Sequence, residues 1–351
     1  MAVKNPGGYI DNGGFRDAMW LITRKKIKHK LLQKMKYQRI TVVLQLIIAI
    51  SFWMTTSVQA STWDPDGYHD ESVNPANPSN PAAEILLDGL EDARSVRISA
   101  LGNIFIVETG RNRIIKTDAN GIRVDSIGRL GAGDYQFDLP VAIDPTNELK
   151  IYIADRNNRR IQVFDRRLQY LSTIKMPQRA GLPSRYQPRK LTVDSSGRIY
   201  FFDEDRHVVY RFDSNGHYEL DFELFSEEER IIPVSMTILD DVLWIAGQRG
   251  ELLHRFTTRG SYIGFMYAPE AVRALRSTGG YLWMLGTERV LQLGSGGEIL
   301  FAKMLPSALR TDRRRGPDSD QRYAEWQSFD VRDDMIYLLN TEMLARVSSI
   351  K

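Results

Sequence analysis

Residues 151–165 read IYIADRNNRRIQVFD, and the first five of them carry the pattern that decides the fold. The pattern is an aliphatic residue, an aromatic residue, two further apolar residues and then a polar or small residue. It recurs at 104–108 (IFIVE), 151–155 (IYIAD), 199–203 (IYFFD), 243–247 (LWIAG), 282–286 (LWMLG) and 336–340 (IYLLN). The chain is therefore built from six copies of one unit.

The spacing of the copies indicates what the unit is. Their aromatic residues follow one another at intervals of 47, 48, 44, 39 and 54 residues, which suits a four-stranded β-propeller blade with loops of variable length. A run of four apolar residues suits a strand that is buried on both faces, as the second strand of a blade is between its neighbours. We predict an all-β, six-bladed β-propeller over residues 84–351.

The two ends of this region predict how the ring closes. The last copy, residues 329–350, has room for only three strands. Residues 84–87 (EILL), just before the first copy, are well placed to add the missing outer strand. Closure by an N-terminal strand would remove an exposed sheet edge, which otherwise invites aggregation.

The second copy resembles the NHL-repeat family. The family motif runs from a proline through a hydrophobic strand to Asp, an Asn-rich loop, Arg and a Val-Phe-Asp strand. The matching positions are Pro140, Asp155, Asn158, Arg160, Ile161, Val163, Phe164 and Asp165. The resemblance spans residues 84–350 and is weaker in the last three copies. It implies an NHL/TolB-like propeller and is not specific for a function.

The N-terminal part, residues 1–60, has the organisation of an export segment. An apolar run at 40–53 (ITVVLQLIIAISFW) follows basic residues, and Val58 and Ala60 stand at the small-residue positions of a cleavage site. The run is shorter than the roughly 20 residues that a membrane span needs. We expect a signal peptide and an exported protein that is periplasmic, in the cell envelope or extracellular. An uncleaved anchor is the alternative, and only then would the protein contact a membrane.

Two further features belong to this part of the chain. Initiation at Met35 would give a signal peptide of ordinary proportions, which suggests that Met1 is not the true start. Residues 61–83 are rich in Pro, Asn, Asp and Ser with almost no aliphatic residues, so we expect a flexible linker there.

The composition excludes several classes of function. The chain has no cysteine, which rules out disulfides, thiolate metal sites and a cysteine nucleophile. Residues 1–60 hold ten of the 47 Lys and Arg but two of the 44 Asp and Glu, which leaves 37 basic and 42 acidic residues beyond them. Because a nucleic-acid-binding protein normally shows the opposite balance, we do not expect nucleic acid as a partner.

Arginine is concentrated in the loops that follow the buried strands, and these loops share one face of a propeller. The candidate binding residues there are Arg111, Arg113, Arg156, Arg159, Arg160, Arg206, Arg249 and Arg289. The long connection 306–324 adds Arg313, Arg314 and Arg315. Arginine favours planar contacts to carboxylates or phosphates. The alternative is that several of these arginines tie the blades together, and that the long connection is disordered.

The sequence predicts no catalytic residue and no metal ligand. Beyond residue 60 its histidines are His69, His207, His217 and His254, with no metal-binding spacing among them. We therefore favour a monomeric, non-catalytic module, without a cofactor, that binds a protein or an acidic polysaccharide. The alternative is a hydrolase or lyase that depends on calcium or zinc in the central channel.

Overall fold

The computed structural model describes residues 83–146, 149–177, 181–183, 185–226, 229–306 and 325–349. All of them lie in the compact unit Pro75–Lys351. The predicted export segment and all but residue 83 of the predicted linker fall outside the described residues. Within the described part no helix is long and apolar enough to cross a membrane.

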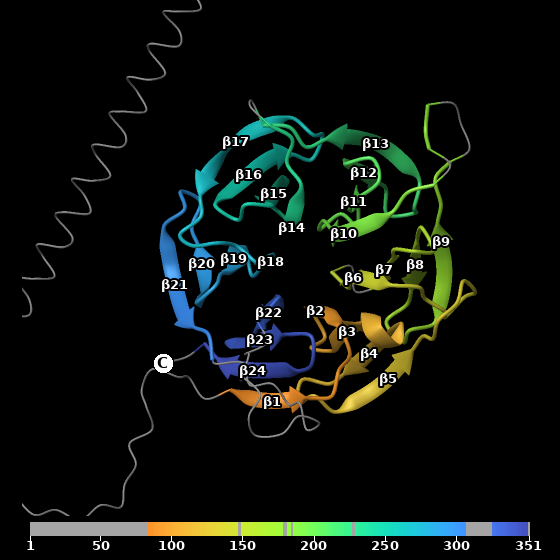
Figure 1. Cartoon of the computed structure of the whole chain (residues 1–351), viewed down its shortest axis with the longest axis horizontal. Coiled ribbons are helices and arrows are strands. Elements are labelled where there is room, and N and C mark those ends of the chain that lie inside the picture. Colours follow the sequence, from red (N-terminus) through yellow and green to blue (C-terminus); the bar gives the residue numbers. More distant parts are fainter. Residues whose placement is uncertain are drawn as a thin grey trace, which may run out of the picture. The chain divides into compact units, whose positions relative to one another are not determined.

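Six antiparallel sheets of four strands each surround a central axis, as Figure 1 shows. The first three blades are β2(Ala93–Ile98) β3(Ile104–Glu108) β4(Arg113–Thr117) β5(Arg123–Ile127), then β6(Pro140–Asp144) β7(Ile151–Asp155) β8(Arg160–Phe164) β9(Tyr170–Ile174), then β10(Pro188–Val193) β11(Ile199–Asp203) β12(Val208–Phe212) β13(Tyr218–Glu223). The fourth and fifth are β14(Pro233–Leu239) β15(Val242–Gly247) β16(Leu252–Thr257) β17(Tyr262–Tyr267) and β18(Ala274–Thr278) β19(Tyr281–Leu285) β20(Arg289–Leu293) β21(Ile299–Met304). The sixth is β22(Ser328–Arg332) β23(Met335–Leu339) β24(Leu344–Ser348) with β1(Glu84–Leu87). The predicted six-bladed propeller is confirmed.

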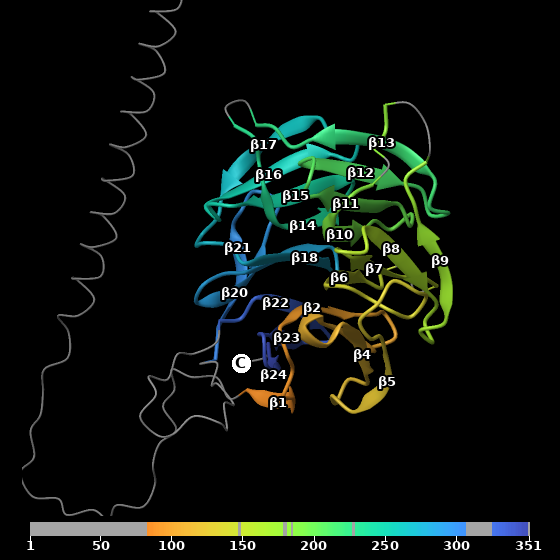
Figure 2. The ribbon, with the colours of Figure 1, turned by 45° about the vertical axis from the view of Figure 1, so that its right-hand side comes forward.

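The ring closes as the sequence predicted. Strand β1 pairs antiparallel with β24, with Glu84 opposite Arg346 and Leu87 opposite Leu344. Figure 2 shows β1 at the outer edge of the sixth blade. The Arg346 guanidinium contacts the Glu84 carboxylate at 2.7 Å. The outer strand of the last blade is thus supplied by the other end of the repeat region.

The second strands are buried on both faces because their side chains alternate between two interfaces. In β11, Phe201 packs in a cluster with Tyr152 of the second blade. Its neighbour Tyr200 packs in a different cluster with Leu243 of the fourth blade. Six such clusters, one between each pair of neighbouring blades, make up the core.

The first strands line the axis and are joined by side chains rather than by a continuous ladder. The amide of Val193 in β10 donates to Asp144 at the end of β6 (3.1 Å). The amide of Ile98 in β2 donates to Asp330 of β22 (2.8 Å). These bonds fix neighbouring blades to each other at the centre of the ring.

Truncation of one interface residue measures what this packing contributes. The Phe201 ring is fully buried and lies 4.6 Å from the Tyr186 ring centroid. We expect Phe201→Ala to lower the free energy of unfolding by about 3–5 kcal/mol, because it leaves a cavity between two blades. Phe265→Ala on the exposed strand β17 is the control and should cost less than about 1 kcal/mol. Equal losses in urea unfolding would contradict the interface packing.

Candidate functional site

The connections between the second and third strands of all six blades form one face of the ring, which we call the loop face. They are residues 109–112, 156–159, 204–207, 248–251, 286–288 and 340–343. The connections that lead from one blade to the next reach the same face. The amide of Gly110 bonds to Glu91 O (2.9 Å) and that of Glu204 to Gln187 O (3.0 Å).

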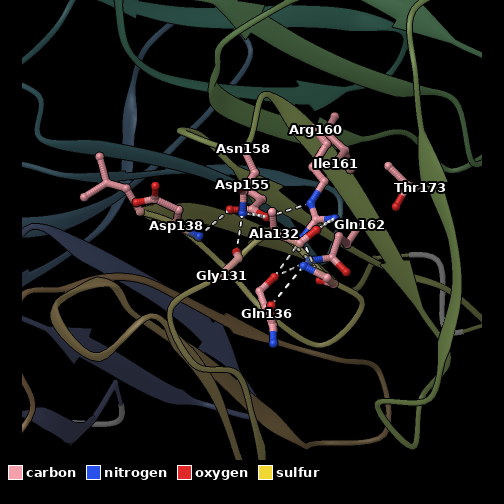
Figure 3. Close-up of polar contacts among 12 residues, drawn as sticks. Gly131, Ala132, Gln136, Asp138, Asp155, Asn158, Arg160, Ile161, Gln162 and Thr173 are labelled. Carbon is pink, nitrogen blue, oxygen red and sulfur yellow. Dashed lines mark hydrogen bonds and ion pairs between the residues drawn. The ribbon is translucent and has the colours of Figure 1, made fainter.

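In the second blade an acid at the end of β7 organises this face. The carboxylate of Asp155 accepts hydrogen bonds from the Asp138 amide, Asn158 Nδ2 and Arg160 Nε, each at 2.8 Å, as Figure 3 shows. Asp155 is fully buried, and that burial raises its pKa against the lowering effect of these partners. Arg160 also donates to the carbonyl oxygens of residues 132, 133 and 136. Arg160 therefore fastens the blade connection and has few donors left for a ligand.

The first blade repeats this arrangement with a glutamate. The carboxylate of Glu108 accepts from the Glu91 amide (3.0 Å), Arg111 (2.5 Å) and Arg113. Arg111 and Arg113 therefore tie the loop to the end of β3. For these two residues, as for Arg160, the pairing supports the structural alternative that the sequence left open.

The third, fifth and sixth blades provide an acceptor at the end of the second strand in different ways. Asp203 accepts from the amides of Gln187 (2.9 Å) and Asp205 (3.1 Å) without an arginine. In the fifth blade Gly286 leaves space that the side chain of Glu270 occupies from the preceding connection, and Arg289 Nε lies 3.4 Å from Glu270 Oε1. In the sixth blade Asn340 Oδ1 accepts from two amides of the following loop.

The fourth blade has no such acceptor among the described residues. Its position is Gly247, which borders a cavity of about 440 Å³ together with His254 and Arg249. The Nε2 atom of His254 lies 3.5 Å from the point where a Cβ of residue 247 would be. The amide of Ile232, which stands in the place of Gln187, has no hydrogen-bond partner within the described ranges. Burial lowers the pKa of His254.

The remaining candidate arginines are more open. Arg156 pairs with Glu204 (2.6 Å) and Arg159 with Asp205 (3.6 Å). Arg206 is exposed, and within the described part of the chain its side chain has no ion pair. Arg249 is 81% exposed, with Glu229 at 3.9 Å. Arg313, Arg314 and Arg315 lie outside the described residues.

A second group of cations lies at the axis, and the sequence analysis missed it. A cavity of about 60 Å³ between the first strands is lined by Arg94, Arg97, Lys190, Arg273 and Arg276, with no acidic residue in its lining. The signal for it was present: these short inner strands carry basic residues among buried apolar ones.

Three of these five cations have a carboxylate partner. Arg97 pairs with the buried Asp144 (3.0 Å), Arg94 with Asp92 (2.8 Å) and Arg273 with Glu325 (3.1 Å). Arg276 bonds instead to the carbonyl oxygens of Phe329 (2.9 Å) and Leu275 (2.8 Å) and to Ser328 Oγ. Lys190 makes no hydrogen bond and no ion pair within the described ranges.

Burial and mutual repulsion perturb the two cations that lack a carboxylate. Burial, with the nearby charges of Arg189 and Arg276, lowers the pKa of Lys190 to about 8. Burial and Arg97 lower the pKa of Arg276 to about 9. Burial raises the pKa of Asp330, against the effect of Arg97 and Arg276. The axis thus has an excess of positive charge.

This lining does not fit a calcium or zinc ion. Both metals need converging oxygen, nitrogen or sulfur ligands, whereas arginine and lysine side chains repel a cation. In the part of the chain that the structure describes, no three His, Cys, Asp or Glu side chains are placed to hold a metal.

Comparisons with known proteins agree with the repeat type and the fold. No protein-family model matches the chain. Human NHL repeat-containing protein 3 is 29% identical over 103 residues, which are 28% of this chain and 26% of that relative. The chain thus covers about a quarter of the length of this curated relative. The match supports the resemblance to NHL-type propellers.

Solved structures with this architecture include enzymes. A streptogramin B lyase matches with a TM-score of 0.55 at 14% identity, and the matched region covers 76% of this chain and 96% of the lyase. A gluconolactonase from Xanthomonas campestris has a TM-score of 0.55 at 15% identity and covers 79% and 99%. At this level of identity the likeness concerns the fold alone, because one fold supports many functions.

A carboxylate introduced at the empty position of the fourth blade should stabilise the protein. In Gly247→Asp the new oxygen would accept the bond that Asp203 accepts in the third blade, which contributes about 0.5–1.5 kcal/mol. Gly247→Ala is the control, since it adds the Cβ without an acceptor. We expect Gly247→Asp to exceed Gly247→Ala in free energy of unfolding, measured in urea. An aspartate variant no more stable than the alanine variant would contradict this account.

Lys190 should titrate well below the ordinary range of lysine. We expect a pKa of about 8 in an NMR titration of labelled lysine, with the resonance assigned by Lys190→Met. Because the pKa is lowered in the folded state, the unfolded chain binds more protons between pH 8 and the ordinary lysine value. The stability contribution of this group should therefore rise with pH through that window. A midpoint at the ordinary value of about 10.4 would contradict the environment described.

Proposed function

We propose that this six-bladed β-propeller, whose repeats resemble those of NHL-repeat proteins, is an exported, monomeric binding module without catalytic activity. Its loop face would recognise an acidic partner, either a protein or an acidic polysaccharide. Export rests on the N-terminal sequence pattern. Recognition rests on the charge of the loop face.

The supporting observation is a group of arginines around the loops of the second and third blades. Arg156, Arg159, Arg189 and Arg206 are gathered there, and the acids that pair with them are Glu204 and Asp205. The chain beyond residue 60 is acidic overall, whereas Arg159 and Arg206 in this group are exposed and Arg206 has no ion pair within the described ranges, so exposed positive charge is available on this part of the loop face. Such a region raises the local concentration of an anionic partner and its association rate.

An exposed aromatic residue near the same face adds an apolar contact. Phe225 is 44% exposed and lies in the connection that leads to β14. The Arg230 guanidinium lies 5.2 Å from the centre of its ring. Aromatic and arginine side chains are enriched in protein interfaces, so this pair suits the edge of a binding surface.

The alternative is a hydrolase or lyase that uses calcium or zinc in the channel. Its support is that propellers of similar fold include a lyase and a gluconolactonase. The cationic lining of the axis argues against it. Metal analysis of the purified protein separates the two proposals, since stoichiometric calcium or zinc would favour the enzyme.

Charge reversal on the loop face tests the binding proposal. In Arg159→Glu/Arg206→Glu we expect the affinity for an immobilised polyuronate or an acidic peptide to fall by about 10-fold or more in about 0.1 M salt. Both residues are exposed, so the melting temperature should stay near that of the wild type. Binding would be measured by surface plasmon resonance.

The matched control is Arg166→Glu/Arg167→Glu. These exposed residues lie between β8 and β9, at the opposite end of the second blade, and their reversal changes the net charge by the same amount. The control should bind like the wild type. If both double variants lose affinity equally, only net charge matters and the loop face is not the site.

A further inference from the structure

The axial cavity lies at the loop-face end of the first strands. Pro188 at the start of β10 pairs with Asp203, and Asp203 leads into the loop 204–207. Strand β10 therefore begins at the loop face and runs along the axis away from it. Lys190 is two residues along that strand. Arg97 and Arg276 stand deeper on their own strands and are only 7% and 8% exposed.

The charges around this cavity do not balance. The five cations of its lining face four carboxylates on the same strands and their flanks: Asp92, Asp144, Glu325 and Asp330. Arg189 and Glu204 also act on Lys190, but they pair with each other at 2.7 Å and add no net charge. With all nine groups ionised, one positive charge remains. Within the described ranges Lys190 makes no hydrogen bond and no ion pair, whereas Arg276 is bonded to oxygen atoms of Phe329, Leu275 and Ser328. We therefore place that charge on the Lys190 ammonium group.

Hydrogen-bond donors are also left over. Arg97 has five N–H donors, and its one hydrogen bond within the described ranges is Nη2 to Asp144. Lys190 has three donors on its ammonium group and uses none of them among the described residues. Half-buried and buried cations that lack partners are costly, and a ligand with acceptor oxygens would satisfy them.

We propose that the loop-face mouth of the axial channel binds one carboxylate group of a ligand, with Lys190 as its principal cation and Arg97 and Arg276 behind it. This inference rests on the proposed function and deepens it, because the carboxylate would belong to the acidic partner.

Size and charge select a carboxylate over a larger dianion. A volume of about 60 Å³ is a few times the roughly 10–15 Å³ that one water requires, which suits a group of three heavy atoms. A single negative charge neutralises the single excess positive charge. The planar carboxylate also matches the fork of an arginine.

The test uses the purified full chain and small probes at constant ionic strength. Sodium acetate and sodium glucuronate should bind in isothermal titration calorimetry, and sodium sulfate and phosphate should bind more weakly. Lys190→Met should weaken carboxylate binding by about 10-fold or more, whereas Lys190→Arg, which retains the cation, should largely preserve it. Lys303→Met on the outer strand β21 is the control and should bind like the wild type.

A second readout does not depend on the stability of a variant. Saturating acetate should raise the pKa of Lys190 from about 8, because a bound anion favours the ammonium form. Tighter binding of glucuronate than of acetate would support a sugar-borne carboxylate, and equal binding would support recognition of the carboxylate alone. Wild-type binding by Lys190→Met, or sulfate as tight as the carboxylates, would overturn the proposal.

The loop-face variant separates this proposal from the function on which it rests. Arg159→Glu/Arg206→Glu should still bind acetate, because neither residue lines the cavity. Binding of small carboxylates without capture of any acidic polymer or peptide would refute the proposed function alone. Capture that is insensitive to Lys190→Met would refute the axial site alone.

Discussion

The structure depends on one constraint: the second strand of every blade is apolar on both faces. Such a strand cannot be hidden by its own sheet, because the sheet covers only its edges. Each blade therefore needs a neighbour on either side, and the requirement ends only when the row closes on itself. The alternation of Tyr200 and Phe201 between two separate clusters is the direct expression of this constraint. Burial of about 1.5–3 kcal/mol per large apolar side chain, repeated around six interfaces, replaces the disulfides that the chain lacks.

Closure of the ring has a consequence for polar groups. Where the buried strands end, backbone amides of the adjoining connections need acceptors, and four blades provide them with Glu108, Asp155, Asp203 or Asn340. In the fifth blade the residue at this point of the sequence is Gly286, which has no acceptor. The carboxylate of Glu270 from the preceding connection lies in the same place and accepts the bond instead. The arginines that pair with these acids stabilise the fold. The loop-face arginines therefore fall into two groups. Arg111, Arg113 and Arg160 hold the fold, whereas Arg159, Arg206 and Arg249 remain open to a partner.

The architecture could be predicted from the sequence because a short apolar pattern, which indicates a strand buried on both faces, repeats six times. Six buried strands and the closing strand at 84–87 follow from hydrophobicity and spacing alone. The role of individual arginines could not be read in the same way, since Arg159 and Arg160 are adjacent and one is 40% exposed while the other is bonded to a buried aspartate. The axial cluster was hidden for a different reason. Arg94, Lys190 and Arg273 are far apart in sequence, and only the ring brings them together.

The axial cations differ from one another in what they do for the fold. Arg97 joins the first blade to the second through Asp144, and Arg276 joins the fifth to the sixth through Ser328 and Phe329. Both contribute to the closed ring, which offsets the cost of burying them. Within the described ranges Lys190 bonds to no neighbouring blade, and burial together with the charges of Arg189 and Arg276 lowers its pKa. A methionine of similar length would fill the same space without that penalty. A buried cation kept at the loop-face end of the axis is best explained by a ligand, because proteins keep such unfavourably placed charges at functional sites.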